Sequence, residues 1–287
     1  MKPLLILGAQ GQVGRTVATL AAARGIEHAA LSRADCDITD PIAVERVLPG
    51  IRVAINCAAY TAVDDAETNG EAAYRINRDG AANVAAACAR TGIPLVHIST
   101  DYVFDGESSR PMKEEDPPHP LNAYGRSKLA GEERVRTILP QHIILRTSWI
   151  FSAYGNNFVK TILRLAQSQP QLRVVADQIG GPTAASDIAK AILEIVSACE
   201  RPGFADWGTY HFCGAPAVSW YEFARAIVGE GGPALVPIAS KDFPRPARRP
   251  CNTVLDCARI QRVFRIGQPD WRQALTDYAL SRLKIIP

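Results

Sequence analysis

A tyrosine and a lysine four residues apart are the first feature of this sequence that could carry chemistry. Tyr124 and Lys128 lie in the stretch AYGRSKLAGE, residues 123–132. On an α-helix this spacing places both side chains on one face, one turn apart. A phenol has an ordinary pKa of about 10, and a neighbouring ammonium lowers the pKa of such a group. Because lysine has further N–H groups for ribose hydroxyls, the pair predicts a proton donor beside a nucleotide cofactor.

Polar residues follow the strand expected over residues 94–100. The stretch reads PLVHISTDY, so an apolar run ends in hydroxyl and carboxyl groups. Open α/β sheets bind ligands at the carboxyl ends of their strands. Side chains alternate between the two faces of a strand, and we assign Thr100 rather than Ser99 to the cofactor face. Its hydroxyl is expected to bond the same substrate oxygen that Tyr124 protonates.

A glycine-rich turn follows the apolar run KPLLIL near the start of the chain. Gly8, Gly11 and Gly14 have the spacing G-x-x-G-x-x-G, and Gln12 and Val13 lie inside it. The helix expected next begins at QVGRTV. Unpaired N–H groups at a helix N-terminus attract phosphate, and glycines let the backbone approach it closely. These five residues are therefore predicted to bind the pyrophosphate of a dinucleotide.

The end of the second expected strand, EHAALSR, indicates which dinucleotide is bound. An NAD site usually has an acidic residue there, which binds the ribose 2′-hydroxyl. This sequence has Ser32 and Arg33 instead. Arginine forms bidentate hydrogen bonds with phosphate oxygens. The sequence therefore favours NADPH, with NADH as a cofactor that it could also accept.

Two further groups are expected at the cofactor. Asp37 and Ile38 follow the second strand and could bracket the adenine, with Asp37 accepting a hydrogen bond from its exocyclic amine. Ala58, Ala59 and Tyr60 follow the third apolar run, IRVAINC. Small residues there would let the backbone lie against the cofactor.

Strand and helix patterns alternate through the first half of the chain. This alternation predicts an α/β fold, a Rossmann-like doubly wound parallel sheet that forms a dinucleotide-binding domain over residues 1–150. One long alanine-rich helix is expected over 70–91. Residues 151–287 are predicted to be mainly a smaller, irregular substrate-binding lobe. Segments near 170–200 are expected to return to the first domain.

Composition excludes several classes of protein. With 32 basic and 29 acidic residues the net charge is only +3, which argues against a nucleic-acid partner. The chain has no apolar run of about 18 residues, so no membrane span is expected. Its cysteines are odd in number, seven, and form no C-x-x-C, which favours reduced thiols in a cytoplasmic protein without a metal site. Cys57 and Cys88 are expected to be small core residues.

Longer blocks of the sequence carry a family resemblance. They read STDYVFDG, PLNAYG, RTSW and GNNF, followed by DQ, GPT and RPCN, and they start at residues 99, 120, 146, 155, 177, 181 and 249. Together these blocks resemble the dTDP-4-dehydrorhamnose reductase family of the extended short-chain dehydrogenase/reductase superfamily. The resemblance covers nearly the whole chain.

The resemblance implies a reaction and roles for residues. NADPH would reduce the C4 ketone of dTDP-4-dehydro-6-deoxy-L-mannose to dTDP-L-rhamnose, a nucleotide sugar for cell-surface polysaccharides such as the lipopolysaccharide O-antigen. Tyr124 would donate the proton, Lys128 would tune it and bind the ribose, and the Thr100 hydroxyl would assist. Contacts with the dTDP-sugar are expected from Thr100, Asp101, Tyr102, Trp149, Asn156 and Arg249, the last at the diphosphate.

Several alternatives stay open at this point. The product could have the rhamnose or the talose configuration, and the base could be thymine or uracil. Relatives of other classes include epimerases and the non-catalytic beta regulatory subunit of methionine adenosyltransferase; intact Thr100, Tyr124 and Lys128 favour a reductase. Some family members pair through magnesium held by glutamates, one of them early in the first helix. Residues 14–17 contain no carboxylate, which argues against magnesium and favours a monomer or weak homodimer.

Overall fold

Six parallel strands form the central sheet, in the order β10-β5-β4-β3-β1-β2. The computed structural model describes residues 2–283. The strands of this sheet are β1 (Leu4–Leu7), β2 (His28–Leu31), β3 (Val53–Asn56), β4 (Leu95–Thr100), β5 (His142–Thr147) and β10 (Gly208–His211). Their apolar runs are continuous rather than alternating because helices cover both faces of the sheet.

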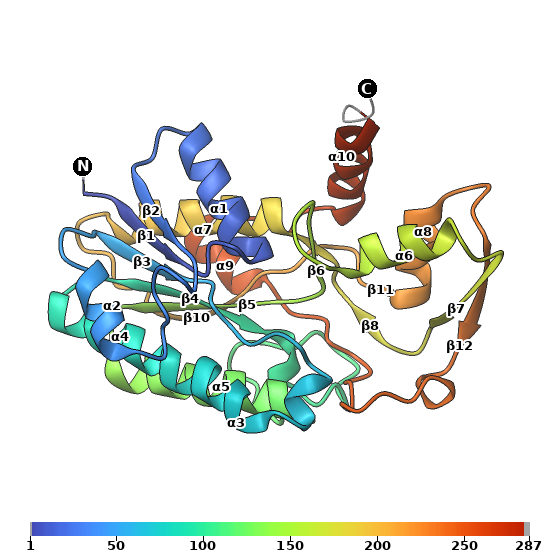
Figure 1. The fold of residues 1–287 in the computed structure, drawn as a ribbon, viewed down its shortest axis with the longest axis horizontal. Coiled ribbons are helices and arrows are strands. Elements are labelled where there is room, and N and C mark those ends of the chain that lie inside the picture. Colours follow the sequence, from blue (N-terminus) through green and yellow to red (C-terminus); the bar gives the residue numbers. More distant parts are fainter. Residues whose placement is uncertain (1, 284–287) are drawn as a thin grey trace.

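Two layers of helices enclose this sheet, as Figure 1 shows. On one face, α1, α7 and α9 cover a core that includes Ile6 and Ile55; on the other, α2, α4 and α5 cover a core that includes Leu5 and Leu7. The helices are α1 (Gln12–Ala23), α2 (Pro41–Val47), α4 (Ala81–Thr91), α5 (Ala123–Ile138), α7 (Ala185–Cys199) and α9 (Ala258–Phe264). This architecture confirms the predicted doubly wound parallel α/β sheet.

The strand order creates a crevice at one edge of the sheet. β1 pairs with β2 on one side and with β3 on the other, all in parallel. The chain therefore crosses over β1 between β2 and β3, and the connections on its two sides leave in opposite directions. Open α/β sheets bind ligands at such a switch point, outside the carboxyl ends of the strands. The glycine turn after β1 and the segment after β3 both lie there.

Later parts of the chain return to this sheet. Helix α7 packs against α1, β10 extends the sheet beside β5, and α9 packs on α7 and β10. Of the segments near 170–200, α7 packs against the first domain, while β7 (Gln171–Val175), β8 (Ile179–Gly180) and β9 (Thr183–Ala184) pair with elements of the smaller lobe.

The remaining elements form a smaller lobe at the right of Figure 1. Short strand pairs and aromatic side chains hold it together, among them Phe151, Phe158 and Phe223. Helix α10 (Trp271–Leu283) stands beside this lobe and packs on β9. The other elements are β6 (Ile150–Phe151), α6 (Phe158–Ala166), β7 (Gln171–Val175), β8 (Ile179–Gly180), β9 (Thr183–Ala184), β11 (Val218–Ser219), α8 (Trp220–Val228) and β12 (Ala234–Ile238).

The helix expected over 70–91 is interrupted. It comprises α3 (Gly70–Tyr74), a π-helical stretch (Arg75–Gly80) and α4, and it ends at Gly92, which has φ +67°. Asn77 lies in the π-helical stretch and is buried. An asparagine with side-chain bonds to make disfavours a regular helix interior, and π-turns are frequent at functional sites.

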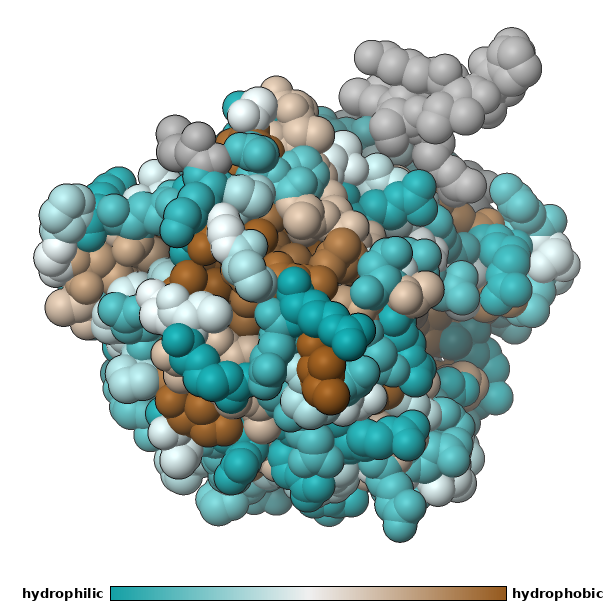
Figure 2. Space-filling model, turned by 60° about the vertical axis from the view of Figure 1, so that its left-hand side comes forward, coloured by the Kyte–Doolittle hydropathy of each residue, from teal (hydrophilic) through white to brown (hydrophobic). Residues whose placement is uncertain are grey.

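The surface at the end of the molecule opposite the smaller lobe is mixed. Figure 2 brings that end forward and shows hydrophobic residues in groups bounded by hydrophilic ones. Within residues 2–283, no helix combines the length and the apolar character needed to cross a bilayer.

Candidate active site

A cleft of about 580 Å³ opens at the carboxyl ends of the strands, between the sheet and the smaller lobe. Thr100, Tyr124 and Lys128 all line it, together with Gln12 and Val13 of the glycine turn. The structure therefore brings the predicted proton-transfer residues and the predicted cofactor turn into one space.

The N-terminal turn of α5 presents Tyr124 and Lys128 to this cleft. Asn122 caps the helix, because its side chain accepts a hydrogen bond of 2.8 Å from the Gly125 N–H. Lys128 is 2% exposed, and its ammonium donates a hydrogen bond of 2.6 Å to the Ile98 carbonyl on β4. The hydrogen bond to β4 thus fixes the direction of the Lys128 side chain.

The expected lowering of the Tyr124 pKa is wrong. Burial raises the pKa of Tyr124 to about 12, while its hydrogen bond with Thr100 lowers it and the charge of Asp101 raises it further. Burial lowers the pKa of Lys128 to about 8, which the charge of Glu132 opposes. The lysine points to the Ile98 carbonyl rather than to the phenol. The phenol consequently keeps its proton at neutral pH, the state a proton donor requires.

Glycine is required where the cofactor turn folds back on itself. Gly8 has φ +77°, and a Cβ there would lie 2.6 Å from the Ala58 nitrogen. A Cβ on Gly14 would lie 2.4 Å from the Gly8 carbonyl oxygen. Larger residues at either position would push this turn away from the strand ends, so glycine keeps the start of α1 close to them.

A second hollow of about 210 Å³ lies on the other side of the glycine turn. Its walls include Arg33, Asp37, Ile38 and Ala58. The Arg33 guanidinium donates to the Asp37 carboxylate at 3.2 Å, but its side chain is 69% exposed and most of its N–H groups are free of this bond. The predicted adenine and phosphate residues are therefore neighbours in space.

Ser32 is less available to a cofactor phosphate than the sequence suggested. Its hydroxyl donates a hydrogen bond of 2.7 Å to Asp35, whose carboxylate also accepts from the Ser32 N–H at 2.9 Å. Ser32 is buried, and it is absent from the residues that line the hollow beside Arg33. Of the two residues predicted to contact a 2′-phosphate, only Arg33 lines this hollow.

Asn77 is a residue that the sequence reasoning missed. Its side-chain oxygen accepts from the Tyr60 N–H at 2.8 Å, and its amide nitrogen donates to the Tyr60 carbonyl at 3.1 Å and to the Ser127 hydroxyl at 2.9 Å. Tyr60 itself donates its phenol to Asp65 and does not line either hollow. Asn77 thus fixes the backbone after β3 against α5. An asparagine inside an alanine-rich helix was the available signal.

Asp101 is largely buried in the wall of the cleft, next to the proton-transfer residues. Its carboxylate accepts a hydrogen bond of 3.0 Å from the Thr100 hydroxyl. Burial raises the pKa of Asp101 to about 7, and hydrogen bonds with Thr253 and Thr100 lower it only in part. Tyr102 lies beside Tyr124 with the rings edge to face and their centroids 6.1 Å apart.

The free energy of unfolding is expected to respond to pH through Asp101. Between pH 3.8, the ordinary pKa, and about 7, the folded protein holds this proton and the unfolded chain releases it. The Asp101 contribution therefore favours folding at low pH and is lost as the pH rises through 7. Urea unfolding of wild type and Asp101→Asn from pH 5 to 8 should show the variant gaining relative stability with rising pH. A constant difference between the two proteins would contradict the buried-carboxyl assignment.

Trp149 forms an aromatic wall with a residue that the sequence reasoning missed. Its indole stacks on Trp220 of α8, with centroids 3.4 Å apart and planes 4° from parallel. Trp149 has φ +45°, a left-handed conformation that is costly for a bulky residue. Both indoles line the cleft, as does Asn156. Trp220 follows Ser219, which caps α8 with Glu222 in an S-x-x-E pattern that was visible in the sequence.

Arg249, predicted to contact the diphosphate, is engaged by neighbouring groups of the protein. Its guanidinium donates to Asp64 at 2.6 Å and to the Ala247 carbonyl at 2.8 Å, and it also bonds the Tyr102 phenol. Arg245 pairs with the same carboxylate at 2.8 Å. Arg249 does not line the cleft, so Asp64 ties the loop over residues 244–252 to the segment after β3.

The cysteines include core residues, residues that line the hollows, and the exposed Cys251. All seven are free thiols within the described chain. Cys88 is buried in the core as expected. Cys57 instead lines both hollows, because it directly follows β3 at the carboxyl edge of the sheet. Burial nevertheless raises the pKa of Cys57 to about 12, so it is not a thiolate.

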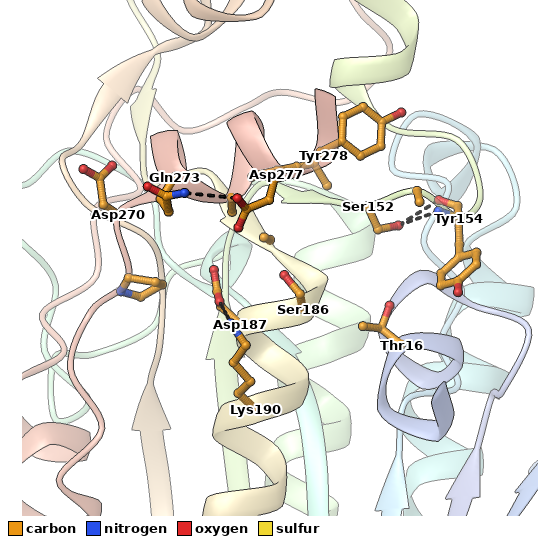
Figure 3. Close-up of a pocket in the computed structure, with 15 residues that line it drawn as sticks. Thr16, Ser152, Tyr154, Ser186, Asp187, Lys190, Asp270, Gln273, Asp277 and Tyr278 are labelled. Carbon is orange, nitrogen blue, oxygen red and sulfur yellow. Dashed lines mark hydrogen bonds and ion pairs between the residues drawn. The ribbon is translucent and has the colours of Figure 1, made fainter. Parts of the chain in front are cut away.

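Another hollow, of about 390 Å³, lies between α1, α7 and α10 (Figure 3). Its polar residues include Thr16, Asp187 and Asp277, and Lys190 pairs with Asp187 at 2.9 Å. In the part of the chain that the structure describes, no cluster of three or more His, Cys, Asp or Glu side chains is arranged to hold a metal.

A phenol that keeps its proton, beside a cleft and a second hollow on either side of a glycine turn, suits the reduction of a carbonyl group. On a doubly wound sheet this defines the class of protein: an oxidoreductase of the extended short-chain dehydrogenase/reductase type. The family follows from comparison. Residues 1–283 match the family described as RmlD substrate binding domain. The chain belongs to this family.

Individual relatives agree with this membership. The dTDP-4-dehydrorhamnose reductase of Aggregatibacter actinomycetemcomitans is 46% identical, over 96% of this chain and 98% of its own. The crystal structure of the Clostridium acetobutylicum reductase is 37% identical with a TM-score of 0.91, covering 99% of this chain and 100% of that one. The Bacillus anthracis reductase, solved in complex with NADP, is 35% identical with a TM-score of 0.91, covering 98% and 99%.

Proposed function

We propose that this protein reduces the C4 ketone of dTDP-4-dehydro-6-deoxy-L-mannose to dTDP-L-rhamnose with NADPH. The observation that carries the proposal is the placement of Tyr124, Lys128 and Thr100 in one cleft that begins at the glycine turn. Its relatives named as dTDP-4-dehydrorhamnose reductases support the substrate, and the NADP complex of the Bacillus anthracis protein supports the cofactor.

The two hollows fit a dinucleotide in shape and chemistry. They lie on either side of the glycine turn and share Gly11, Cys57 and Ala59 in their walls. The smaller one has the exposed Arg33 guanidinium for a 2′-phosphate, and the larger one contains Tyr124 and Lys128. A bound NADPH would supply a hydride to the substrate carbonyl carbon.

The residues of the chain would handle the proton. As the hydride reaches the carbonyl carbon, negative charge grows on the oxygen, and a positioned acid lowers that barrier. Tyr124 would donate the phenolic proton to this oxygen, and the Thr100 hydroxyl would hold the same oxygen in place. Lys128 would bind the ribose with the N–H groups that the Ile98 carbonyl leaves free.

The parts of the chain would divide the two ligands between them. Residues 1–150, with α7, β10 and α9, would bind the dinucleotide, and the rest of 151–287 would bind the sugar. Asp101, Tyr102, Trp149 and Asn156 would contact the deoxysugar. The Arg249 guanidinium would reach a diphosphate only with the N–H groups that Asp64 does not occupy.

NADPH is expected to bind more tightly than NADH, and Arg33→Ala should remove most of the difference. Loss of a charge-assisted hydrogen bond to phosphate costs about 1.5–3 kcal/mol, or roughly 10- to 150-fold in Kd. Fluorescence titrations of wild type and Arg33→Ala with both cofactors measure this, and NADH serves as the internal control. Equal affinity of the wild type for the two cofactors would remove the argument from Arg33.

Free thiols throughout the described chain support a reducing compartment, and we place the enzyme in the cytoplasm as a monomer or weak homodimer. The alternative of a non-catalytic regulatory subunit gains no support from the relatives named above.

Mixing the protein with NADPH and dTDP-4-dehydro-6-deoxy-L-mannose, and identifying the product by NMR, tests the proposal. We expect dTDP-L-rhamnose; a talose product would correct the stereochemistry, and no oxidation of NADPH would overturn the function.

A further inference from the structure

The side chain of Gln12 joins the glycine turn to the smaller lobe. Its Oε1 atom accepts a hydrogen bond of 2.9 Å from the Ser152 hydroxyl and one of 3.0 Å from Asn157 Nδ2. Ser152 and Asn157 follow β6 and precede α6, about 140 residues further along the chain. The start of the cofactor helix is therefore connected to the lobe that faces it across the cleft.

Three hydrogen bonds determine which way these two amides point. Asn157 is the N-cap of α6, so its Oδ1 accepts from the Lys160 N–H at 3.1 Å. Its Nδ2 must then face the other way, where it donates to the Ser152 carbonyl at 2.8 Å and to Gln12. Because a donor faces Gln12, the carboxamide of Gln12 presents its oxygen to Asn157 and turns its own NH₂ away.

That NH₂ group is available to a ligand. Within residues 2–283, Gln12 Nε2 makes no hydrogen bond, and Gln12 lines the 580 Å³ cleft. Gln12 is absent from the smaller hollow around Arg33, whereas Gly11 lines both. Its two N–H donors therefore belong to the part of the groove beyond the glycine turn, on the side of Tyr124 and Lys128.

Packing holds the connecting turn in place. Gly155 has φ +60°, and a Cβ there would lie 3.3 Å from Gln12 Cγ. The Arg15 guanidinium lies over the Tyr154 ring, 4.4 Å from its centroid. The turn over residues 152–157 thus rests on the first turn of α1 and restrains the Gln12 side chain.

We propose that Asn157 is a positioning residue that orients the Gln12 carboxamide so that its NH₂ donates to the phosphate on the nicotinamide side of the dinucleotide. The inference rests on the proposed binding of NADPH at the glycine turn. It assigns to a residue of the smaller lobe a part in cofactor binding, although Asn157 itself need not touch the cofactor.

Asn157→Asp tests this positioning with little change in shape. An aspartate still caps α6, because one carboxylate oxygen accepts from the Lys160 N–H. The other oxygen faces Gln12 Oε1 and also the Ser152 carbonyl, so the hydrogen bond to Ser152 is lost. The repulsion from Gln12 Oε1 turns the carboxamide so that its oxygen points into the cleft. We expect the Kd for NADPH to rise roughly 10- to 100-fold, the loss of a hydrogen bond to a charged group. The Kd for adenosine 2′,5′-bisphosphate, which lacks the nicotinamide half, should not change.

A double-mutant cycle separates positioning from the added charge. Gln12→Met removes the NH₂ without adding charge and should weaken the binding of NADPH to a similar extent. In the Gln12→Met background, Asn157→Asp should have little further effect, because there is no carboxamide left to turn. The inference is overturned if Asn157→Asp raises the Kd for NADPH by the same factor in the wild-type and Gln12→Met backgrounds. It is also overturned if Asn157→Asp raises the Kd for the bisphosphate as much as the Kd for NADPH. If wild type binds the bisphosphate but not NADPH, the proposed function fails; if wild type binds NADPH and Asn157→Asp does so equally well, the inference fails alone.

Discussion

Replacing Tyr124 with phenylalanine is expected to lower the rate of a single turnover by roughly 10²- to 10⁴-fold, the usual contribution of a general acid. The phenol is the group at the cleft with an available proton, since Lys128 is assigned to the ribose and Thr100 is a far weaker acid. Affinity for NADPH should barely change, because the phenol is expected to make few contacts with the dinucleotide. Rapid-mixing kinetics and a separate binding titration measure the two quantities.

Lys128→Ala is the matched comparison, one helical turn away. It removes a ribose contact and the charge that Glu132 helps to maintain, so both turnover and affinity for NADPH should fall. If Tyr124→Phe keeps the turnover of the wild type, the proton-donor assignment is wrong. The Tyr-x-x-x-Lys spacing would then be only the start of a helix.

The second large effect is expected on stability, at the buried ion pair of Glu132 and Arg146. Glu132 is fully buried and accepts hydrogen bonds of 2.9 and 2.7 Å from the Arg146 guanidinium and 2.5 Å from the Ser99 hydroxyl. Burial raises the pKa of Glu132, but the charge and hydrogen bonds of Arg146 outweigh that effect and lower it to about 2. Glu132→Gln leaves the arginine charge buried without a partner charge.

We expect Glu132→Gln to lower the free energy of unfolding by about 3–5 kcal/mol, the usual cost of breaking a buried pair from one side. Urea unfolding at pH 7 measures it. The control is Glu45→Gln, which breaks an exposed pair with Arg90 and should cost at most about 1 kcal/mol. Because the folded pKa of Glu132 is depressed, its contribution is present above pH 4.5 and is lost as the pH falls toward 2. Equal costs for the two variants would contradict the assignment.

Local patterns in the sequence determined the fold and the elements that carry the site. Apolar runs that end in glycine or polar residues predicted β1, β3, β4 and β5, because strands covered on both faces need no alternation. Parallel strands place their carboxyl ends at one edge, which is why the glycine turn, Thr100 and Tyr124 could be assigned to one cleft before their positions were known. The helix-breaking preference of Asn77 was also visible, but its partners, Tyr60 and Ser127, were not.

Tertiary structure decided the pKa values, the partners and the orientations of the side chains in the site. The pKa of Tyr124 depends on burial and on the direction of Lys128, and neither follows from a spacing of four. Arg249 pairs with Asp64, and the indole of Trp149 stacks on Trp220. These partners lie so far apart in the sequence that no local pattern links them. The Gln12 carboxamide has an orientation only because Asn157 caps a helix in the other lobe. A sequence specifies which groups are present; the direction of a hydrogen bond and the cost of burying a charge are properties of the packed structure.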